Sequence, residues 1–171
     1  MPTHRFAKQT PVLEVDHDLD IGPVVVRQSE DLLTVARRAF RHPSTRLLAV
    51  VDEADRLVGV MPVLRVVEEV VAHAAPEQLM ADVTDIESAA RFGREVGAHT
   101  CGDLMNPPVA LRRDSTVADA FRAMQEHHYS GLPVVDDEGR VIAYIDLLEL
   151  ALRYLEERSA PADSPSPEPP L

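Results

Sequence analysis

Two acidic residues near the end of the chain have a spacing that suits the start of a helix. Asp146 and Glu149 lie three residues apart and directly follow an apolar stretch. An acid at the first of these positions accepts hydrogen bonds from unpaired N–H groups of the next turn, and the second reaches back. The pair therefore predicts a helix cap that needs no ligand. Glu149 can equally accept hydrogen bonds from the hydroxyl groups of a bound sugar.

The first half of the chain has basic chemistry at the same spacing. Pro62 and Arg65 follow the apolar stretch Leu57–Met61. Proline suits a first helical position because the N–H that it lacks has no partner there. Arg65, together with Arg46, can pair with a phosphate attracted to the helix start, but it cannot accept a hydrogen bond from a sugar. The two places therefore predict opposite preferences for ligand charge.

The sequence lacks the motifs of common catalytic sites. It contains no G-x-S-x-G, P-loop, G-x-G-x-x-G or H-E-x-x-H pattern. His127 and His128 end an expected helix, where the helix dipole favours histidine, and no ligand spacing joins His128 to Asp146 as a metal site. We expect no catalytic residues, no metal and no enzyme activity. A small enzyme that uses the acidic second site is the weakest alternative.

An internal repeat relates the two places. Residues 23–68 recur as residues 107–152, at a constant offset of 84 and without a gap. A repeat present only twice indicates two similar units packed on each other, since a solenoid needs three or more. Two units about an approximate twofold axis create paired clefts, which suit a ligand-sensing or assembly module better than a single catalytic pocket.

Both copies predict the element order β-α-β-β-α. The Thr116-x-x-Asp119 capping box marks a helix start in the second copy, and Asp and Gly residues mark a hairpin turn in both copies. The expected elements of the first copy are a strand Val24–Val26, a helix Asp31–Arg41, strands Leu47–Val51 and Leu57–Met61, and a helix Pro62–His73. Those of the second are Val109–Leu111, Thr116–His127, Leu132–Val135, Val141–Ile145 and Asp146–Arg158.

These elements predict five segments along the chain. They are an N-terminal segment 1–14, a first unit 15–75, a linker insert 76–100, a second unit 101–158 and a tail 159–171. Within the insert, the Thr84-x-x-Glu87 capping box predicts a helix as far as Val96. The tail contains five prolines and no hydrophobic run, so we expect it to be disordered.

Composition excludes several classes of partner. The net charge of −12 argues against nucleic acid and anionic lipid. The longest apolar-rich stretch, Val141–Leu155, is interrupted by charges and cannot span a membrane, and the N-terminus has no apolar signal core. Cys101 is the only cysteine, which fits a reducing compartment. We therefore expect a cytoplasmic protein.

Three motifs of the second copy resemble a known family. Cys101-Gly-Asp-Leu-Met105, Asp114-Ser-Thr-Val117 and Gly131-Leu-Pro-Val-Val-Asp136 resemble the second unit of a CBS-domain pair, also called a Bateman module. The resemblance covers about residues 15–158. It implies an α+β fold of two repeated β-α-β-β-α units about a pseudo-twofold axis. It also implies a stand-alone regulatory module that binds AMP, ADP, ATP or S-adenosylmethionine in two clefts and dimerises as a flat disc.

The family marks each cleft with a Gly, a Ser or Thr three residues later, and an Asp three residues after that. This chain departs from the pattern in both copies, with Gly59, Pro62 and Arg65 in the first and Ala143, Asp146 and Glu149 in the second. The resemblance implies the following ligand-binding residues: Val25, Thr45, Arg46, Leu47, Pro62, Arg65, Val109, His128, Tyr129, Ser130, Gly131, Pro133, Asp146 and Glu149.

The leading hypothesis is a regulatory sensor or adaptor whose effector protein the sequence does not name. The main alternative is a structural dimerisation module without a ligand. A homodimer is expected in either case, because the last helix is apolar over more width than one sheet can cover. Its stripe consists of Leu147, Leu148, Ala151, Leu152 and Leu155.

Overall fold

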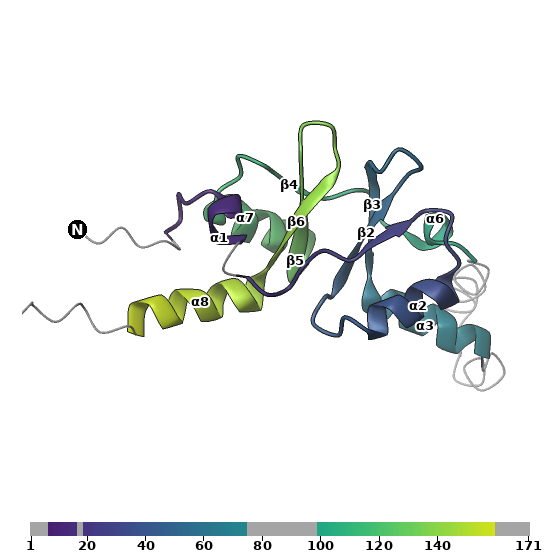
Figure 1. The fold of residues 1–171 in the computed structure, drawn as a ribbon. Helices are drawn as coiled ribbons and strands as arrows, with labels where there is room; N and C mark the ends of the chain where they lie inside the picture. The colour runs from purple at the N-terminus through teal and green to yellow at the C-terminus, as the bar shows by residue number, and fades with distance from the viewer. Residues whose placement is uncertain (1–6, 17–18, 75–98, 160–171) are drawn as a thin grey trace, which may run out of the picture.

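The computed structural model describes residues 7–16, 19–74 and 99–159. The helix expected after Thr84 and nearly all of the expected disordered tail lie outside these residues. Two three-stranded sheets stand side by side in the middle of the molecule, and their helices lie toward opposite ends (Figure 1).

The predicted β-α-β-β-α order is confirmed in both units. The first unit consists of β1 (Val25–Arg27), α2 (Leu32–Phe40), β2 (Leu47–Val51), β3 (Leu57–Pro62) and α3 (Val63–Ala74). The second consists of β4 (Leu111–Arg112), α7 (Val117–His127), β5 (Gly131–Val135), β6 (Val141–Asp146) and α8 (Leu147–Ser159). In each sheet the first strand pairs parallel with the second, and the second pairs antiparallel with the third.

The helices that follow the first strands begin where predicted, and each begins at a capping residue. The Asp31 carboxylate accepts a hydrogen bond of 2.9 Å from the Thr34 N–H at the start of α2. Thr116 and Asp119 form the expected reciprocal capping box at the start of α7. The hydrogen bond from the Thr116 backbone N–H lowers the pKa of Asp119, because it favours the charged carboxylate.

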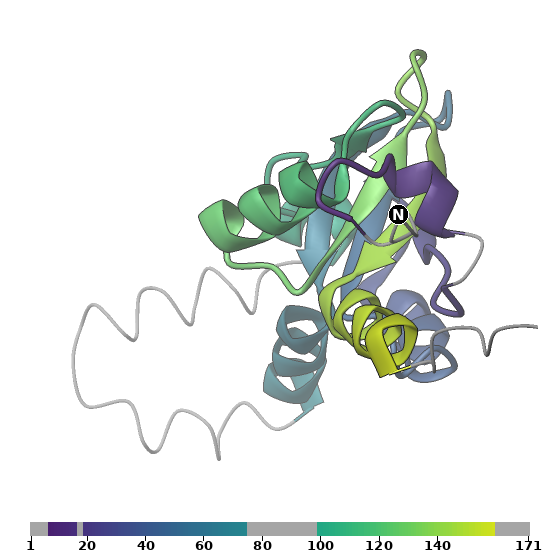
Figure 2. The same ribbon diagram turned by 90° about the vertical axis from the view of Figure 1, so that its left-hand side faces the viewer.

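Two short helices pack on the unit that they do not precede in the sequence. Helix α1 (Val12–Asp16) precedes the first unit but packs on β6, and its Val12 and Val15 are fully buried in the core of the second unit. Helix α6 (Cys101–Leu104) precedes the second unit but packs on β3 of the first. Figure 1 shows α6 near β3, and Figure 2 shows the purple helix α1 against the yellow-green strand β6. Each unit therefore completes the core of the other.

Backbone hydrogen bonds fix the N-terminal segment to the second unit. The Val117 and Ala118 N–H groups, at the start of α7, donate to the Thr10 and Lys8 carbonyls at 2.9 Å each. A helix start leaves such donors without partners inside the helix, so residues 8–10 satisfy two of them. The segment before α6 meets α2 in a similar way, with the Leu32 N–H donating to the His99 carbonyl at 3.1 Å.

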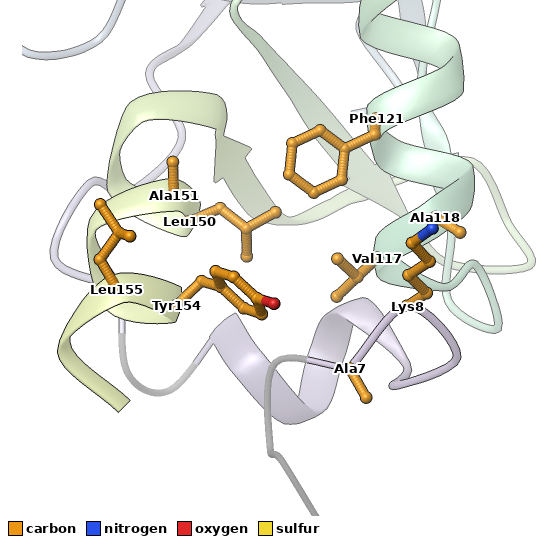
Figure 3. A pocket seen from close by; sticks show the side chains of 9 residues that line it. All are labelled: Ala7, Lys8, Val117, Ala118, Phe121, Leu150, Ala151, Tyr154 and Leu155. Carbon is orange, nitrogen blue, oxygen red and sulfur yellow. The ribbon is translucent and has the colours of Figure 1, made fainter. Parts of the chain in front are cut away.

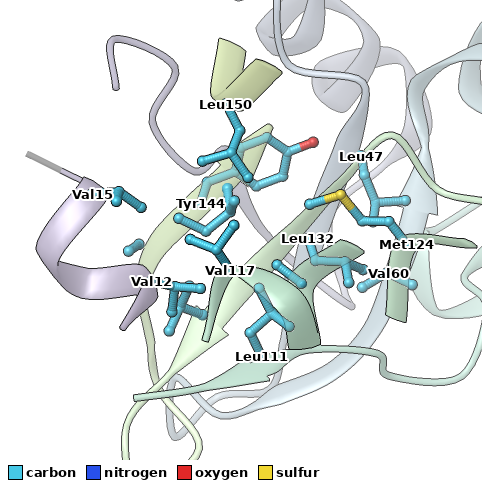
Figure 4. Close-up of a cluster of buried hydrophobic side chains, with 14 residues drawn as sticks. Val12, Val15, Leu47, Val60, Leu111, Val117, Met124, Leu132, Tyr144 and Leu150 are labelled. Atoms are coloured by element: carbon cyan, nitrogen blue, oxygen red, sulfur yellow. The ribbon is translucent and has the colours of Figure 1, made fainter. Parts of the chain in front are cut away.

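The two units share one of the hydrophobic cores. Leu47 and Val60 of the first unit are buried in the cluster that contains Leu132, Tyr144 and Met124 of the second (Figure 4). The two hairpin tips also meet, since the Leu57 N–H donates to the Gly139 carbonyl at 2.9 Å. These contacts make the two units one packed body.

Some predicted boundaries were wrong. Pro62 does not start a helix. It is the last residue of β3 and pairs with Leu47, and the Val63 N–H continues this pairing by donating to the Arg46 carbonyl. Strands β1 and β4 begin later than the expected Val24 and Val109. Helix α1 was not predicted at all. None of the described helices is both long enough and apolar enough to cross a membrane.

Candidate ligand sites between the two units

Each unit places the start of its last helix against the residues that lead into the other unit. We call residues 19–24 the first lead-in segment, since they run into β1, and residues 105–110 the second, since they run toward β4. The first site is the place where α3 meets the second lead-in segment. The second site is the place where α8 meets the first lead-in segment.

A hydrogen-bonded chain of three side chains crosses the first site. The Arg65 Nη1 donates to the Asn106 Oδ1 at 3.0 Å, and the Asn106 Nδ2 donates to the Tyr129 hydroxyl at 2.9 Å. Arg65 lies in the first turn of α3, whereas Tyr129 follows α7 of the second unit. Tyr129, one of the expected ligand-binding residues, thus belongs to the first site. No described carboxylate forms an ion pair with Arg65, so its positive charge is not neutralised by the described residues.

The second site is acidic, and the chain itself occupies its acids. Asp146 is buried, and its carboxylate accepts hydrogen bonds from the Leu148 and Glu149 N–H groups at 2.9 and 3.1 Å. This confirms that Asp146 caps α8. Glu149 does not reach back to complete a capping box. Its two carboxylate oxygens accept hydrogen bonds from the Asp20 and Ile21 N–H groups, the latter at 3.1 Å.

An ion pair strengthens the same contact. The Arg153 Nη2, one turn further along α8, lies 2.9 Å from the Asp20 carboxylate. On the side of the first unit, the Thr45 hydroxyl donates to the Gly22 carbonyl at 3.4 Å. Thr45 and Gly22 correspond to Tyr129 and Asn106 at the repeat offset of 84. The two sites therefore use equivalent positions, but with different chemistry.

Gly59 and Ala143 explain why the two lead-in segments are held differently. The second lead-in segment forms a two-way backbone bridge with β3, with Asn106 N to Val60 O at 2.8 Å and Val60 N to Asn106 O at 3.1 Å. A Cβ at Gly59 would lie 2.8 Å from the Asn106 carbonyl oxygen, so the bridge requires glycine. The second unit has Ala143 at this position, and the first lead-in segment, which it contacts, is held by the Glu149 side chain instead.

The two sites also differ in where a large and a small side chain stand on neighbouring strands. A Cβ at Gly131 would lie 2.6 Å from the Cζ of Tyr144, so the ring takes the space where a side chain would stand. The equivalent positions of the first unit are Leu47 and Val60, with the larger residue on the other strand. The phenolic oxygen of Tyr144 is buried and forms no hydrogen bond with the described residues. Burial, with a contribution from Asp146, raises the pKa of Tyr144 to about 12.

The other expected site residues lie around these places with various exposures. Thr45, Leu47 and Pro133 are buried, while Arg46 and His128 are exposed. His128 ends α7 in the left-handed conformation, with φ of 57°. The Ser130 carbonyl accepts from the Leu147 N–H at 2.8 Å, and the Val25 carbonyl accepts from Arg38 at 3.0 Å. Val109 packs against the core of the second unit.

Sequence reasoning missed Asn106, Asp20 and Ile21. The recognisable repeat begins at Pro23 and Pro107, one residue after Gly22 and Asn106. Asn106 could have been found as a polar residue between Met105 and a Pro-Pro pair. Nothing in the sequence indicates that the Asp20 and Ile21 backbone binds a carboxylate, because this contact joins residues 128 or more positions apart.

A family model and a relative both match most of the sequence. The family model described as CBS domain matches residues 15–72 and 101–156. Protein MJ1426 of Methanocaldococcus jannaschii, described as uncharacterized, is 28% identical over 148 residues, which cover 77% of this chain and 88% of that protein.

Solved structures of CBS-domain proteins have the same fold. A CBS domain-containing protein of Thermotoga maritima has a TM-score of 0.67 at 21% identity, covering 88% of this chain and 97% of that one. CBSX2 of Arabidopsis thaliana in complex with AMP has a TM-score of 0.58 at 21% identity, covering 81% of this chain and 96% of that one. The CBS domain pair of protein MJ0100, in complex with 5′-methylthioadenosine and S-adenosyl-L-methionine, has a TM-score of 0.59 at 19% identity. The match covers 84% of this chain and 96% of that one. With two matched segments and two β-α-β-β-α units packed together, the chain belongs to the CBS-domain family as a CBS pair.

Proposed function

We propose that the chain is a regulatory module that binds an adenosine-containing ligand between its two units and passes this signal to another protein. Membership of the CBS-domain family supports a regulatory role. The titles of two similar structures describe complexes with AMP, and with S-adenosyl-L-methionine and 5′-methylthioadenosine, which supports a ligand of this class. The proposal includes no catalytic step and no resident cofactor.

The observation that carries the proposal is the guanidinium of Arg65 at the start of α3, which forms an ion pair with no carboxylate in the part of the chain that the structure describes. The N-terminus of a helix carries a partial positive charge and N–H groups without partners inside the helix, which together attract phosphate. Arg65 adds a full charge and several donors, of which the described residues use one, for Asn106. A phosphate at the first site would therefore meet cationic groups held in place by the neighbouring unit.

The second site has the opposite character. A phosphate there would meet Asp146 and Glu149, and like charges at this distance repel. Ribose hydroxyls could donate to Glu149 only in competition with the Asp20 and Ile21 N–H groups. We therefore propose that AMP, ADP and ATP bind the first site, and that the second accepts only ligands of little negative charge, such as adenosine or S-adenosylmethionine.

Calorimetric titration of adenine compounds tests the proposal. The Arg65→Ala variant should bind ATP and AMP about tenfold more weakly than the wild type, because a charge-assisted contact is lost, while its affinity for adenosine should change little. Arg37→Ala is the matched control, since Arg37 is an exposed arginine on α2. If no adenine compound binds the wild type at millimolar concentration, the alternative of a dimerisation module without a ligand is favoured.

We further propose that the module is a cytoplasmic homodimer that assembles through α8. Leu148, Leu152 and Leu155 are 57%, 54% and 59% exposed, which is unusual for leucines at i, i+4 and i+7 on one helix. Covering these side chains in a second copy would remove apolar area from water. Light scattering at micromolar concentration should give the mass of a dimer, and the mass of a monomer would contradict this part of the proposal.

A further inference from the structure

A cavity of about 760 Å³ lies between α7, α8 and the N-terminal segment, on the outer side of the second unit. Its lining is almost entirely apolar. Figure 3 shows Phe121 and Val117 reaching into it from α7, and Leu150 and Tyr154 from α8. Concave apolar sites of a few hundred cubic ångströms with a few polar groups are typical of small-molecule binding. The cavity does not involve Arg65, Asn106, Asp146 or Glu149, so it is separate from the two sites described above.

One basic residue stands at the rim of the cavity. Lys8 is the only lysine of a chain whose net charge is −12, and its side chain is exposed. No described carboxylate pairs with Lys8. Its position is fixed by the backbone, because the Lys8 carbonyl accepts the Ala118 N–H at 2.9 Å at the start of α7. The backbone of Lys8 is therefore fixed at the rim of the cavity, and its exposed side chain can reach an anion bound there.

The surface that we assign to the homodimer lies mostly elsewhere on α8. Leu148 and Leu152 do not line the cavity, whereas Leu155 belongs to both surfaces. A second copy would also have to bring an anionic group to Lys8 and an apolar group of suitable shape into the concavity. A small molecule with one anionic head and one apolar tail satisfies both requirements at once.

We propose that this cavity binds a medium-chain carboxylate, with the alkyl chain between α7 and α8 and the carboxylate beside Lys8. The proposal does not depend on nucleotide binding between the two units. Burial of the chain makes affinity depend on length, with a gain of about fourfold for each added methylene from octanoate to dodecanoate. The ammonium of Lys8 makes affinity depend on the head group.

Titration calorimetry with decanoate, decanol and decyltrimethylammonium, below their micellar concentrations, tests the head group. The wild type should prefer decanoate. Lys8→Met should weaken decanoate by about fivefold at low salt, because the contact is exposed, and should leave decanol unchanged. Lys8→Arg should retain the preference. Equal binding of the three compounds to the wild type, or an equal loss of all three in Lys8→Met, would overturn the proposal.

Filling the cavity tests the place of binding. Ala151→Phe puts a ring into the cavity and should weaken decanoate by more than tenfold. Gln125→Phe adds the same ring to an exposed position of α7 outside the cavity and should change nothing. Melting temperatures of both variants establish that they are folded. Unchanged decanoate affinity in a folded Ala151→Phe variant would overturn the proposal. The proposal would also be overturned if the wild type bound no decanoate and Ala151→Phe disrupted its dimer, because the cavity would then belong to the dimer interface.

Discussion

The two sites between the units start from one repeated sequence and differ in charge. At the first, a glycine lets the lead-in segment approach β3 through its backbone, and among the described residues Arg65 binds only a neutral amide. At the second, Ala143 stands in place of this glycine, and Glu149 holds the lead-in segment through its carboxylate. The residue that could bind a ligand is thus left available at one site and used for structure at the other.

This difference shows how a duplicated site can be specialised without changing the fold. In both copies the same position of the last helix contacts the lead-in segment of the other unit. Contact with an amide leaves the arginine charge available to an anion, while contact with two N–H groups fills the oxygens of the glutamate. The fold requires a contact at this position, and the identity of the residue decides whether a ligand can share it.

The largest expected effect concerns Gly131 and Tyr144 of the second unit, whose equivalents in the first unit are Leu47 and Val60. Gly131→Leu forces a side chain into the space of the Tyr144 ring and should lower the free energy of unfolding by about 3 kcal/mol in urea denaturation. Adding Tyr144→Val copies the first unit and should recover at least half of this loss. No recovery would mean that the two pairs of positions are not equivalent in packing.

The next effect tests the glycine of the first site. Gly59→Ala places a Cβ 2.8 Å from the Asn106 carbonyl oxygen and should lower the free energy of unfolding by about 2 kcal/mol. Ala143→Gly is the matched change at the second site. It should cost less than about 1 kcal/mol, which is the ordinary entropic cost of a glycine in a strand. Equal losses in the two variants would contradict the different roles of these positions.

Asp146→Thr should make the second site more like the first. Threonine keeps a hydroxyl that can cap α8 and removes a buried anion. We expect AMP or ATP binding at the second site to tighten roughly tenfold, about 1.4 kcal/mol, with a loss of stability under about 1 kcal/mol. Calorimetric titration measures the first quantity and urea denaturation the second. Weaker nucleotide binding in this variant would show that Asp146 does not repel phosphate.

The smallest effect at neutral pH concerns the phenol of Tyr144. Its pKa is about 12 in the folded protein and 10 in the free side chain, so the unfolded chain loses this proton first. The free energy of unfolding should therefore fall as pH rises from 10 to 12. Tyr144→Phe should remove this part of the decline. At neutral pH it should also stabilise the protein by about 1 kcal/mol, since a buried hydroxyl without a partner is lost. Identical pH profiles would contradict the assignment.

Local signals predicted most of the fold. Asp31 and Thr116 were predicted to start helices and do so, because a capping side chain bonds only to its neighbours. Helix α1 was missed because Val12 and Val15 give a short apolar pattern that becomes helical only when buried against β6. The partners of Arg65 and Glu149 could not be predicted for a similar reason. They lie in the lead-in segment of the other unit, and no local pattern indicates such a contact.

The number of ATP molecules bound per chain tests the central claim most directly. If the two sites differ in charge as the structure indicates, calorimetric titration of the wild type should give one ATP per chain, and Arg65→Ala should weaken that binding while Asp146→Thr should add a second site. Two equal sites in the wild type, or ATP binding that is unchanged in Arg65→Ala, would contradict the account.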